Sequence, residues 1–282
     1  MISRFALLVC FSPLFAQTTN WIAAGNRALD DGNPREAATD FARALQMNGS
    51  GLSADDLVHL RVTLATAYME AGDYRAAESV LLDIRKDGDP ADGRSAAEVL
   101  NAWSAVHLKL GQLAEAEADL VDAQRILLKS PGPGDLMGTV LHNLAAIELR
   151  TGRYAEALQH ERAALTQLEK TAPPDDAALI RAWASLASLQ YMTGQVQDAR
   201  LSMERALNAA ESRYGPAHPL IADLLESDAI VLDRLKLKKP ARQARDRARA
   251  IRASSGATAE QPLTWNVRDM ARPGDAVYLR SK

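Results

Sequence analysis

The sequence predicts an all-α solenoid in which about six antiparallel helix pairs stack on one another. Glycine and alanine recur about every forty residues, each within a stretch that has the apolar periodicity of a helix. Aromatic residues make up only 5% of the chain, so its 47% hydrophobic content consists mainly of Ala, Leu, Val and Ile. This composition favours close helix packing over a sheet, because sheets prefer β-branched and aromatic residues.

The repeat is marked by a turn position at the end of each first helix. Neighbouring turn glycines lie 39 to 42 residues apart. The six turn positions are Gly32, Gly72, Gly111, Gly152, Gly194 and Lys236. Five residues after them stand Ala37, Ala77, Ala116, Ala157, Ala199 and Ala241. Seven residues before them stand Gly25, Ala65, Ser104, Ala145, Ala187 and Ala229. Because small residues let helices cross closely and glycine can end a helix in a left-handed conformation, each repeat is predicted to be a helical hairpin.

Four segments carry a family resemblance. GDYRAAESVL, GQLAEAEADL, GRYAEALQHE and GQVQDARLSM resemble the turn and second helix of tetratricopeptide repeats (TPRs). The first repeat matches the large and small positions of that motif at Trp21, Gly25, Gly32, Ala37, Phe41 and Ala44. The spacing exceeds the usual one of the family and is similar to the long repeats of kinesin light chains. The resemblance covers residues 18–255 and implies a right-handed superhelix whose first helices line a concave groove.

The repeats are separated by loops rich in turn-forming residues. We predict repeats near 18–51, 58–91, 97–130, 138–171, 180–213 and 222–255. The loops between them are NGSGLSADD (48–56), KDGDPADG (86–93), SPGPGD (130–135), TAPPDD (171–176) and YGPAHP (214–219). Proline disfavours continuation of a helix, and nearby Asp, Ser or Asn can cap the next one. The sixth repeat departs most from the motif, with Lys236 at the turn and Arg245 at a large apolar position.

Residues 1–16 have the pattern of a secretory signal peptide. Arg4 precedes a short apolar run that ends at Ala16. The run is too short to span a bilayer as a mature anchor. Cys10 is the only cysteine, so cleavage would leave a chain without disulfide or thiolate chemistry. We therefore expect a periplasmic or secreted protein, and the alternative is an uncleaved first helix in a cytoplasmic protein.

The C-terminal segment 256–282 breaks the repeat pattern with Pro262, Pro273 and Gly274. Trp265 and Tyr278 stand there in polar surroundings. We expect an irregular or disordered tail, and docking of these aromatic residues on the last repeat or on a partner is the alternative.

The concave groove is the candidate binding site. The repeat register predicts that first helices project the following residues into it: Asn26, His59, Thr66, Asn101, His142, Arg181, Ser188, Asp223 and Glu226. The family resemblance implies that a clamp for a C-terminal carboxylate would need lysine at set first-helix positions, and none of those positions holds one. A mixed polar and small groove suits an extended or helical peptide of unknown identity. The alternative is that many of these residues only pack against each other.

A second feature is a basic strip on the last predicted helix. It consists of Lys238, Arg242, Arg245, Arg249 and Arg252, opposite an apolar face. Such a strip could meet an anionic surface, but a terminal repeat also needs a polar outer face, and we favour this second interpretation. The net charge of −3 and the expected export argue against nucleic acid.

No motif for catalysis, a metal or a cofactor stands out. His218, in the segment RYGPAHPL, is the one residue that could be considered, with Ser212 and Asp223 close in sequence. Turns occupy the equivalent place in the other repeats, so His218 is interpreted as a turn residue at a helix start. The remaining histidines have no metal-binding spacing. The predicted function is a non-catalytic scaffold for a protein partner. The alternatives are a cytoplasmic regulatory adaptor and, remotely, a hydrolase that uses His218.

Overall fold

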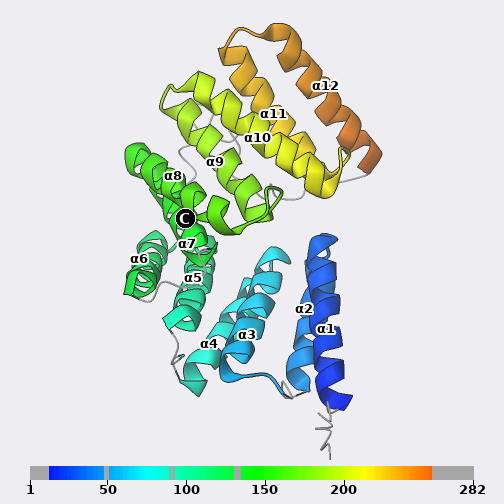
Figure 1. Cartoon of the computed structure of the whole chain (residues 1–282), viewed down its shortest axis with the longest axis vertical. Coiled ribbons are helices and arrows are strands. Elements are labelled where there is room, and N and C mark those ends of the chain that lie inside the picture. Colours follow the sequence, from blue (N-terminus) through cyan, green and yellow to red (C-terminus); the bar gives the residue numbers. More distant parts are fainter. Residues whose placement is uncertain (1–12, 48–50, 89, 91–92, 130–134, 256–282) are drawn as a thin grey trace, which may run out of the picture. The chain divides into compact units, whose positions relative to one another are not determined.

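The computed structural model describes residues 13–47, 51–88, 90, 93–129 and 135–255. This part of the chain forms twelve α-helices and no strand, which confirms the predicted all-α class of about six helix pairs (Figure 1). The helices are α1 (Pro13–Asp30), α2 (Pro34–Gln46), α3 (Ala54–Glu70), α4 (Tyr74–Asp87), α5 (Gly93–Lys109), α6 (Leu113–Lys129), α7 (Asp135–Arg150), α8 (Tyr154–Thr171), α9 (Ala177–Met192), α10 (Val196–Tyr214), α11 (Pro219–Arg234) and α12 (Lys238–Ser255).

The chain divides into two compact units, residues 1–130 and residues 131–282. In each unit, consecutive helices pair as hairpins: α1 with α2, α3 with α4 and α5 with α6 in the N-terminal unit, and α7 with α8, α9 with α10 and α11 with α12 in the C-terminal unit. Within each unit, the first helix of a hairpin also packs on the hairpin before it, as α3 does on α2 and α11 does on α10. Stacking of this kind covers the apolar face that an isolated helix pair would leave open.

All six hairpin turns share one backbone geometry. The five turn glycines have φ between 74° and 81°, and Lys236 takes the same left-handed conformation at 63°. In each turn the next residue donates its N–H to a carbonyl five residues earlier, as from Gln195 to Gln190 at 2.7 Å and from Leu237 to Leu232 at 2.9 Å. This is the bonding of a Schellman cap, which satisfies carbonyls at the end of a helix.

Small residues sit where the helices cross. The alanines five residues after each turn position are completely buried. An added Cβ at Gly25 would lie 2.6 Å from the ring of Phe41, which is itself fully buried. The register of small residues in the sequence therefore reflects the close approach of the two helices in a hairpin.

Polar residues of the predicted loops cap several first helices. Ser53 and Asp56 form a capping box at the start of α3, and Asp176 accepts the N–H of Ala178 at the start of α9. A side-chain acceptor at this position satisfies an N–H that has no partner inside the helix. The loops thus fix where these first helices begin.

Two predictions fall at the ends of the chain. The predicted signal peptide, 1–16, overlaps the described residues only at the first turn of α1, and the tail 256–282 lies outside them. Among the described helices, none is long and apolar enough to cross a membrane.

Candidate functional site

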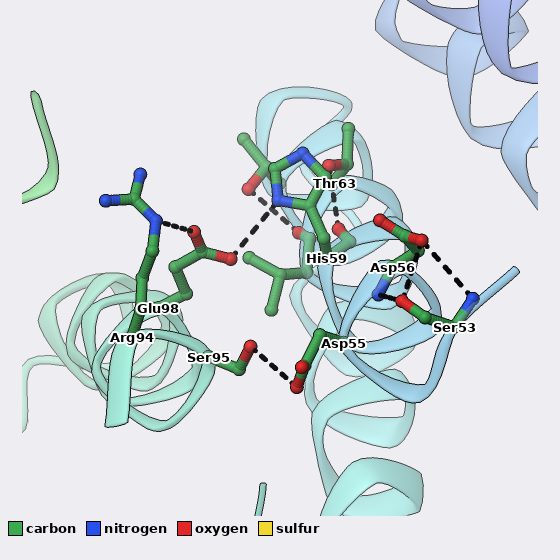
Figure 2. Close-up of polar contacts among 10 residues, drawn as sticks. Ser53, Asp55, Asp56, His59, Thr63, Arg94, Ser95 and Glu98 are labelled. Atoms are coloured by element: carbon green, nitrogen blue, oxygen red, sulfur yellow. Dashed lines mark hydrogen bonds and ion pairs between the residues drawn. The ribbon is translucent and has the colours of Figure 1, made fainter. Parts of the chain in front are cut away.

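The neighbouring first helices α3 and α5 form a polar surface in the N-terminal unit (Figure 2). We call this surface the α3–α5 face and define it by Asp55, His59, Thr63 and Thr66 of α3 and Arg94, Ser95 and Glu98 of α5. His59 Nδ1 lies 3.2 Å from Glu98 Oε2. Arg94 Nε lies 3.4 Å from the other oxygen of the same carboxylate. One glutamate therefore joins two cationic groups across the two helices.

A second contact fixes the same pair of helices one turn nearer their start. Ser95 Oγ donates to Asp55 Oδ1 at 3.2 Å, and Ser95 is buried. Figure 2 shows this bond beneath the His59–Glu98 pair, with the Ser53–Asp56 capping box at the beginning of α3. The α3–α5 face is thus held by bonds between the helices as well as by a cap on α3.

The charge on this face depends on His59. Its side chain is 69% exposed, whereas that of Glu98 is only 15% exposed. The hydrogen bond that His59 donates to Glu98 raises the pKa of His59 above the ordinary 6.5, and the negative charge of Glu98 adds to this effect while burial opposes it. The imidazole therefore carries more positive charge near neutral pH than a free histidine would. The hydroxyls of Thr63 and Thr66 donate to the carbonyls of His59 and Val62, which leaves their lone pairs available to a bound chain.

The predicted groove residues of the N-terminal unit lie on three first helices. Asn26 of α1 and Thr66 of α3 are exposed, and Asn101 of α5 is half-buried with its carbonyl accepting from Ser104 at 2.7 Å. His59 is joined directly to the neighbouring first helix α5 through Glu98. Its partner Glu98 was not among the predicted residues. Glu98 lies six residues before Ser104, just as His59 lies six residues before Ala65, so the repeat register itself contained this signal.

The predicted groove residues of the C-terminal unit have other roles as well. His142 of α7 bonds through Nδ1 to Glu161 of α8 at 2.9 Å. Ser188 is buried, and its hydroxyl donates to the carbonyl of Ala184, which places it within the core. Arg181 is half-buried on α9. Asp223 and Glu226 of α11 both accept from Arg252 of α12, the former at 2.8 Å.

The arginines of the predicted basic strip are compensated by carboxylates. Arg245 pairs with Asp233 of α11 at 2.5 Å, while Arg242 and Arg249 both lie against Asp246 of their own helix. Arg252 lies between the two α11 carboxylates named above, and Lys238 is exposed at the start of α12. Much of the positive charge of this strip is therefore neutralised within the C-terminal unit.

His218 caps a helix, as its place in the sequence suggested. Its Nδ1 accepts the N–H of Leu220 at 3.2 Å at the start of α11, so the ring proton lies on Nε2. The ring stacks on Tyr214 with centroids 4.6 Å apart. Burial lowers the pKa of His218 below 6.5. Asp223, five residues later in the sequence, accepts a hydrogen bond from Arg252.

Across the described ranges, no three His, Cys, Asp or Glu side chains are grouped so that they could hold a metal ion.

Sequence models of known families match two adjoining parts of the chain. A tetratricopeptide repeat model matches residues 28–100 and a second one matches residues 95–170, so that together they span half of the chain. The chain belongs to the tetratricopeptide repeat family. TPRs bind protein partners and are in general non-catalytic scaffolds. A search of curated protein sequences finds no significant match.

Solved structures agree with this TPR assignment. The chain is similar to BtubC (BKLC) from P. vanneervenii, with 19% identity, a TM-score of 0.62, and coverage of 90% of this chain and 96% of that one. It is similar to nearly identical, kinesin light chain-like TPR repeats from Podospora anserina, with 18% identity, a TM-score of 0.57, and coverage of 73% of this chain and 100% of that one. It is also similar to aspartyl phosphate phosphatase F from Bacillus subtilis, with 13% identity, a TM-score of 0.58, and coverage of 89% and 74%. At these identities the likeness establishes the shared fold.

Proposed function

We propose that this TPR protein is a non-catalytic scaffold that holds a peptide or protein partner against its first helices. The observation that carries the proposal is the α3–α5 face, where two neighbouring first helices present exposed polar groups instead of apolar packing. Exposed His59 and Thr66 stand on this face, and Glu98 and Asp55 tie the helices beneath them. Repeat proteins of this type use extended surfaces of adjacent helices to bind partners.

The chemistry of the face suits a peptide that offers hydrogen-bonding groups. Most charged groups on it are already matched, since Glu98 contacts both His59 and Arg94. A strongly charged ligand would have to break these contacts, whereas a polar or mixed segment could use the free side of His59 and the threonine hydroxyls. Affinity would then come from shape and hydrogen bonds more than from net charge.

We propose that this scaffold functions outside the cytoplasm, and the signal-like sequence pattern at residues 1–16 supports this proposal. The alternative is a cytoplasmic regulatory adaptor with an uncleaved N-terminus. Expression of the full-length gene followed by N-terminal sequencing separates the two. A mature start near Gln17 agrees with export, and an intact Met1 contradicts it.

The binding proposal can be tested with peptides selected by display against the purified protein. Thr66→Arg places a bulky side chain on the α3–α5 face, and Ser79→Arg adds the same side chain at an exposed position of the second helix α4. We expect Thr66→Arg to weaken peptide binding by about tenfold or more, measured by calorimetry, while Ser79→Arg has little effect. His142 is a poor choice for such a test because it also bonds to buried Glu161.

Equal losses in the two variants, or none in Thr66→Arg, would refute the placement of the partner on the α3–α5 face. Far-UV circular dichroism and melting curves confirm that each variant keeps the fold. Both substituted residues are exposed, so little effect on stability is expected.

A further inference from the structure

One interhelical polar contact recurs at the same repeat position with different chemistry. In α5/α6, His107 Nδ1 lies 2.7 Å from Asp119 Oδ2. In α7/α8, His160 Nδ1 lies 2.8 Å from Glu148 Oε2. Both pairs join residues twelve apart in sequence, three residues after the small residue of the first helix and three after the alanine of the second. The histidine is on the first helix in one hairpin and on the second helix in the other.

The next hairpin provides an uncharged version of the same contact. In α9/α10, Ser202 Oγ donates to Gln190 Oε1 at 2.7 Å, again over twelve residues, and both side chains are buried. Three of the six hairpins therefore place two complementary polar groups at this position, with a different pair in each. The other three have Ala28 and Asp40, Tyr68 and Val80, and Leu232 and Ala244 there. The α9/α10 pair also supplies a comparison in which neither group titrates.

The α7/α8 hairpin is distinct because it contains two imidazole–carboxylate pairs in opposite directions. His142 of α7 contacts both oxygens of Glu161 of α8, at 2.9 and 3.1 Å, and His160 of α8 contacts Glu148 of α7. The side chain of Glu161 is only 1% exposed and that of Glu148 is 5% exposed. Two carboxylates are thus buried between two helices, each bonded to a histidine of the opposite helix.

The number of protons that each pair shares decides the charge that this interface buries. An ionised carboxylate can only accept, so Nδ1 of the histidine then donates. A pair is neutral when it holds one proton more than an ionised carboxylate beside a neutral imidazole, and without that proton it carries a net negative charge. A buried net charge is costly unless it is matched. Loss of one proton from each pair would leave two unmatched negative charges inside one hairpin.

We propose that the α7/α8 hairpin is a pH-sensitive element that opens more readily as the pH rises. The α9/α10 hairpin has a glutamine–serine contact in place of these pairs. Burial raises the pKa of Glu161 above the ordinary 4.5, against the opposing effect of His142, which means that the folded hairpin holds this proton more firmly than the unfolded chain. A raised pKa of this kind gives stability that is lost as the pH rises, in agreement with the direction of the proposal.

Other charged and titratable groups occur on the helices around these pairs. Besides the four paired residues, α7 carries Asp135 and Arg150, and burial lowers the pKa of Arg150. The helix α9 packs on α8, and its charged and titratable residues are Arg181 and Tyr191. The remaining groups of α8 are Tyr154, Glu156, Arg162, Glu169 and Lys170. The charge and hydrogen bond of His142 are the interactions that shift the pKa of Glu161 apart from burial.

Amide hydrogen exchange of the full-length protein between pH 6 and pH 9 tests the proposal. After correction for the intrinsic exchange rate, we expect the protection of α7 and α8 to fall by up to about tenfold per pH unit for each proton released on opening. The protection of α9 and α10 should change much less. This comparison needs only the wild-type protein. If the protection of the two hairpins depends equally on pH, the proposal is wrong.

Two variants test the role of each pair. Glu148→Gln with His160→Ser transfers the α9/α10 contact into α7/α8, and Glu161→Gln keeps the shape of the second pair without its charge. Each should reduce the pH dependence of α7/α8, while Glu156→Gln, at an exposed site in the first turn of α8, should leave it unchanged. Wild-type pH dependence in both pair variants, or a loss of it in Glu156→Gln, would contradict the assignment.

Discussion

Lys236 occupies a backbone conformation that five other repeats give to glycine, and replacing it with glycine should stabilise the protein. Its φ of 63° is the one positive φ of a non-glycine residue in the described part of the chain. The left-handed region costs a residue with a Cβ about 1–2 kcal/mol. Glycine recovers this energy but loses about 0.5–1 kcal/mol through the greater entropy of its unfolded chain. The expected net gain of Lys236→Gly is therefore about 0–1.5 kcal/mol, with a midpoint of about 0.75 kcal/mol.

Thermal unfolding followed by circular dichroism measures a gain near this midpoint as a rise in Tm of about 1–4 °C. Gly194→Ala provides the reciprocal change, because an added Cβ there meets no atom within 4 Å and only the backbone conformation is tested. It should cost about 1 kcal/mol. Lys239→Gly is the matched control in helix α12, where glycine should destabilise by about 0.5–1 kcal/mol.

The three variants make the reasoning refutable. If Lys236→Gly lowers Tm as Lys239→Gly does, the left-handed conformation of Lys236 is not a source of strain in the native protein. If Gly194→Ala leaves Tm unchanged, the turn itself tolerates a side chain, and the energetic argument fails for all six hairpins.

Three further predictions each concern a single residue. Burial raises the pKa of Asp228 to about 6, so the stability that this group adds in its protonated form is lost as the pH rises from about 4 to about 6. Urea unfolding at a series of pH values measures this loss as a fall in the free energy of unfolding. Asp228→Leu should abolish the fall and raise the free energy of unfolding at pH 7 by about 1–2 kcal/mol, after allowance for the partial exposure of Asp228. An unchanged pH dependence in this variant would exclude Asp228 as its source. Gly25→Ala should lower Tm by several degrees, because its new methyl group collides with Phe41, and Gly25→Ala with Phe41→Leu should recover part of the loss. His218→Ala removes the cap on Leu220 and should cost about 1 kcal/mol, whereas His218→Asn, which can cap equally well, should cost little; a similar loss in both would show that the cap is not what His218 contributes.

The sequence predicted the positions of the helices and turns because these depend on local and periodic features. Glycine and small residues recur with the register of the helix crossings, and even Lys236 was placed at its turn by spacing alone. The compensation of the basic strip was not predicted. Arg252 finds its partner Asp223 29 residues earlier in sequence, and the choice of partner depends on how two packed helices face each other.

The polar contacts between helices were missed for the same reason. His142 was placed on a first helix, but its bond to Glu161 depends on the side-chain direction within the hairpin. Ser188 was expected to face a partner and is instead buried against its own helix. The His59–Glu98 contact, by contrast, joins equivalent positions of successive repeats, so comparison of repeats position by position would have revealed it.

The hairpin turns have a consequence for how such a chain can change in length. In all six hairpins the small residue of the first helix and the alanine of the second are twelve residues apart, because one capped turn fixes the path between them. The differences in repeat length, from 39 to 42 residues, therefore arise outside this twelve-residue unit. The second helices contribute to them, since α2 has 13 residues and α10 has 19. Insertions should be accepted in the loops between hairpins and rejected inside the turns. Whole hairpins are thus the natural parts for recombination or for engineered exchange between TPR proteins.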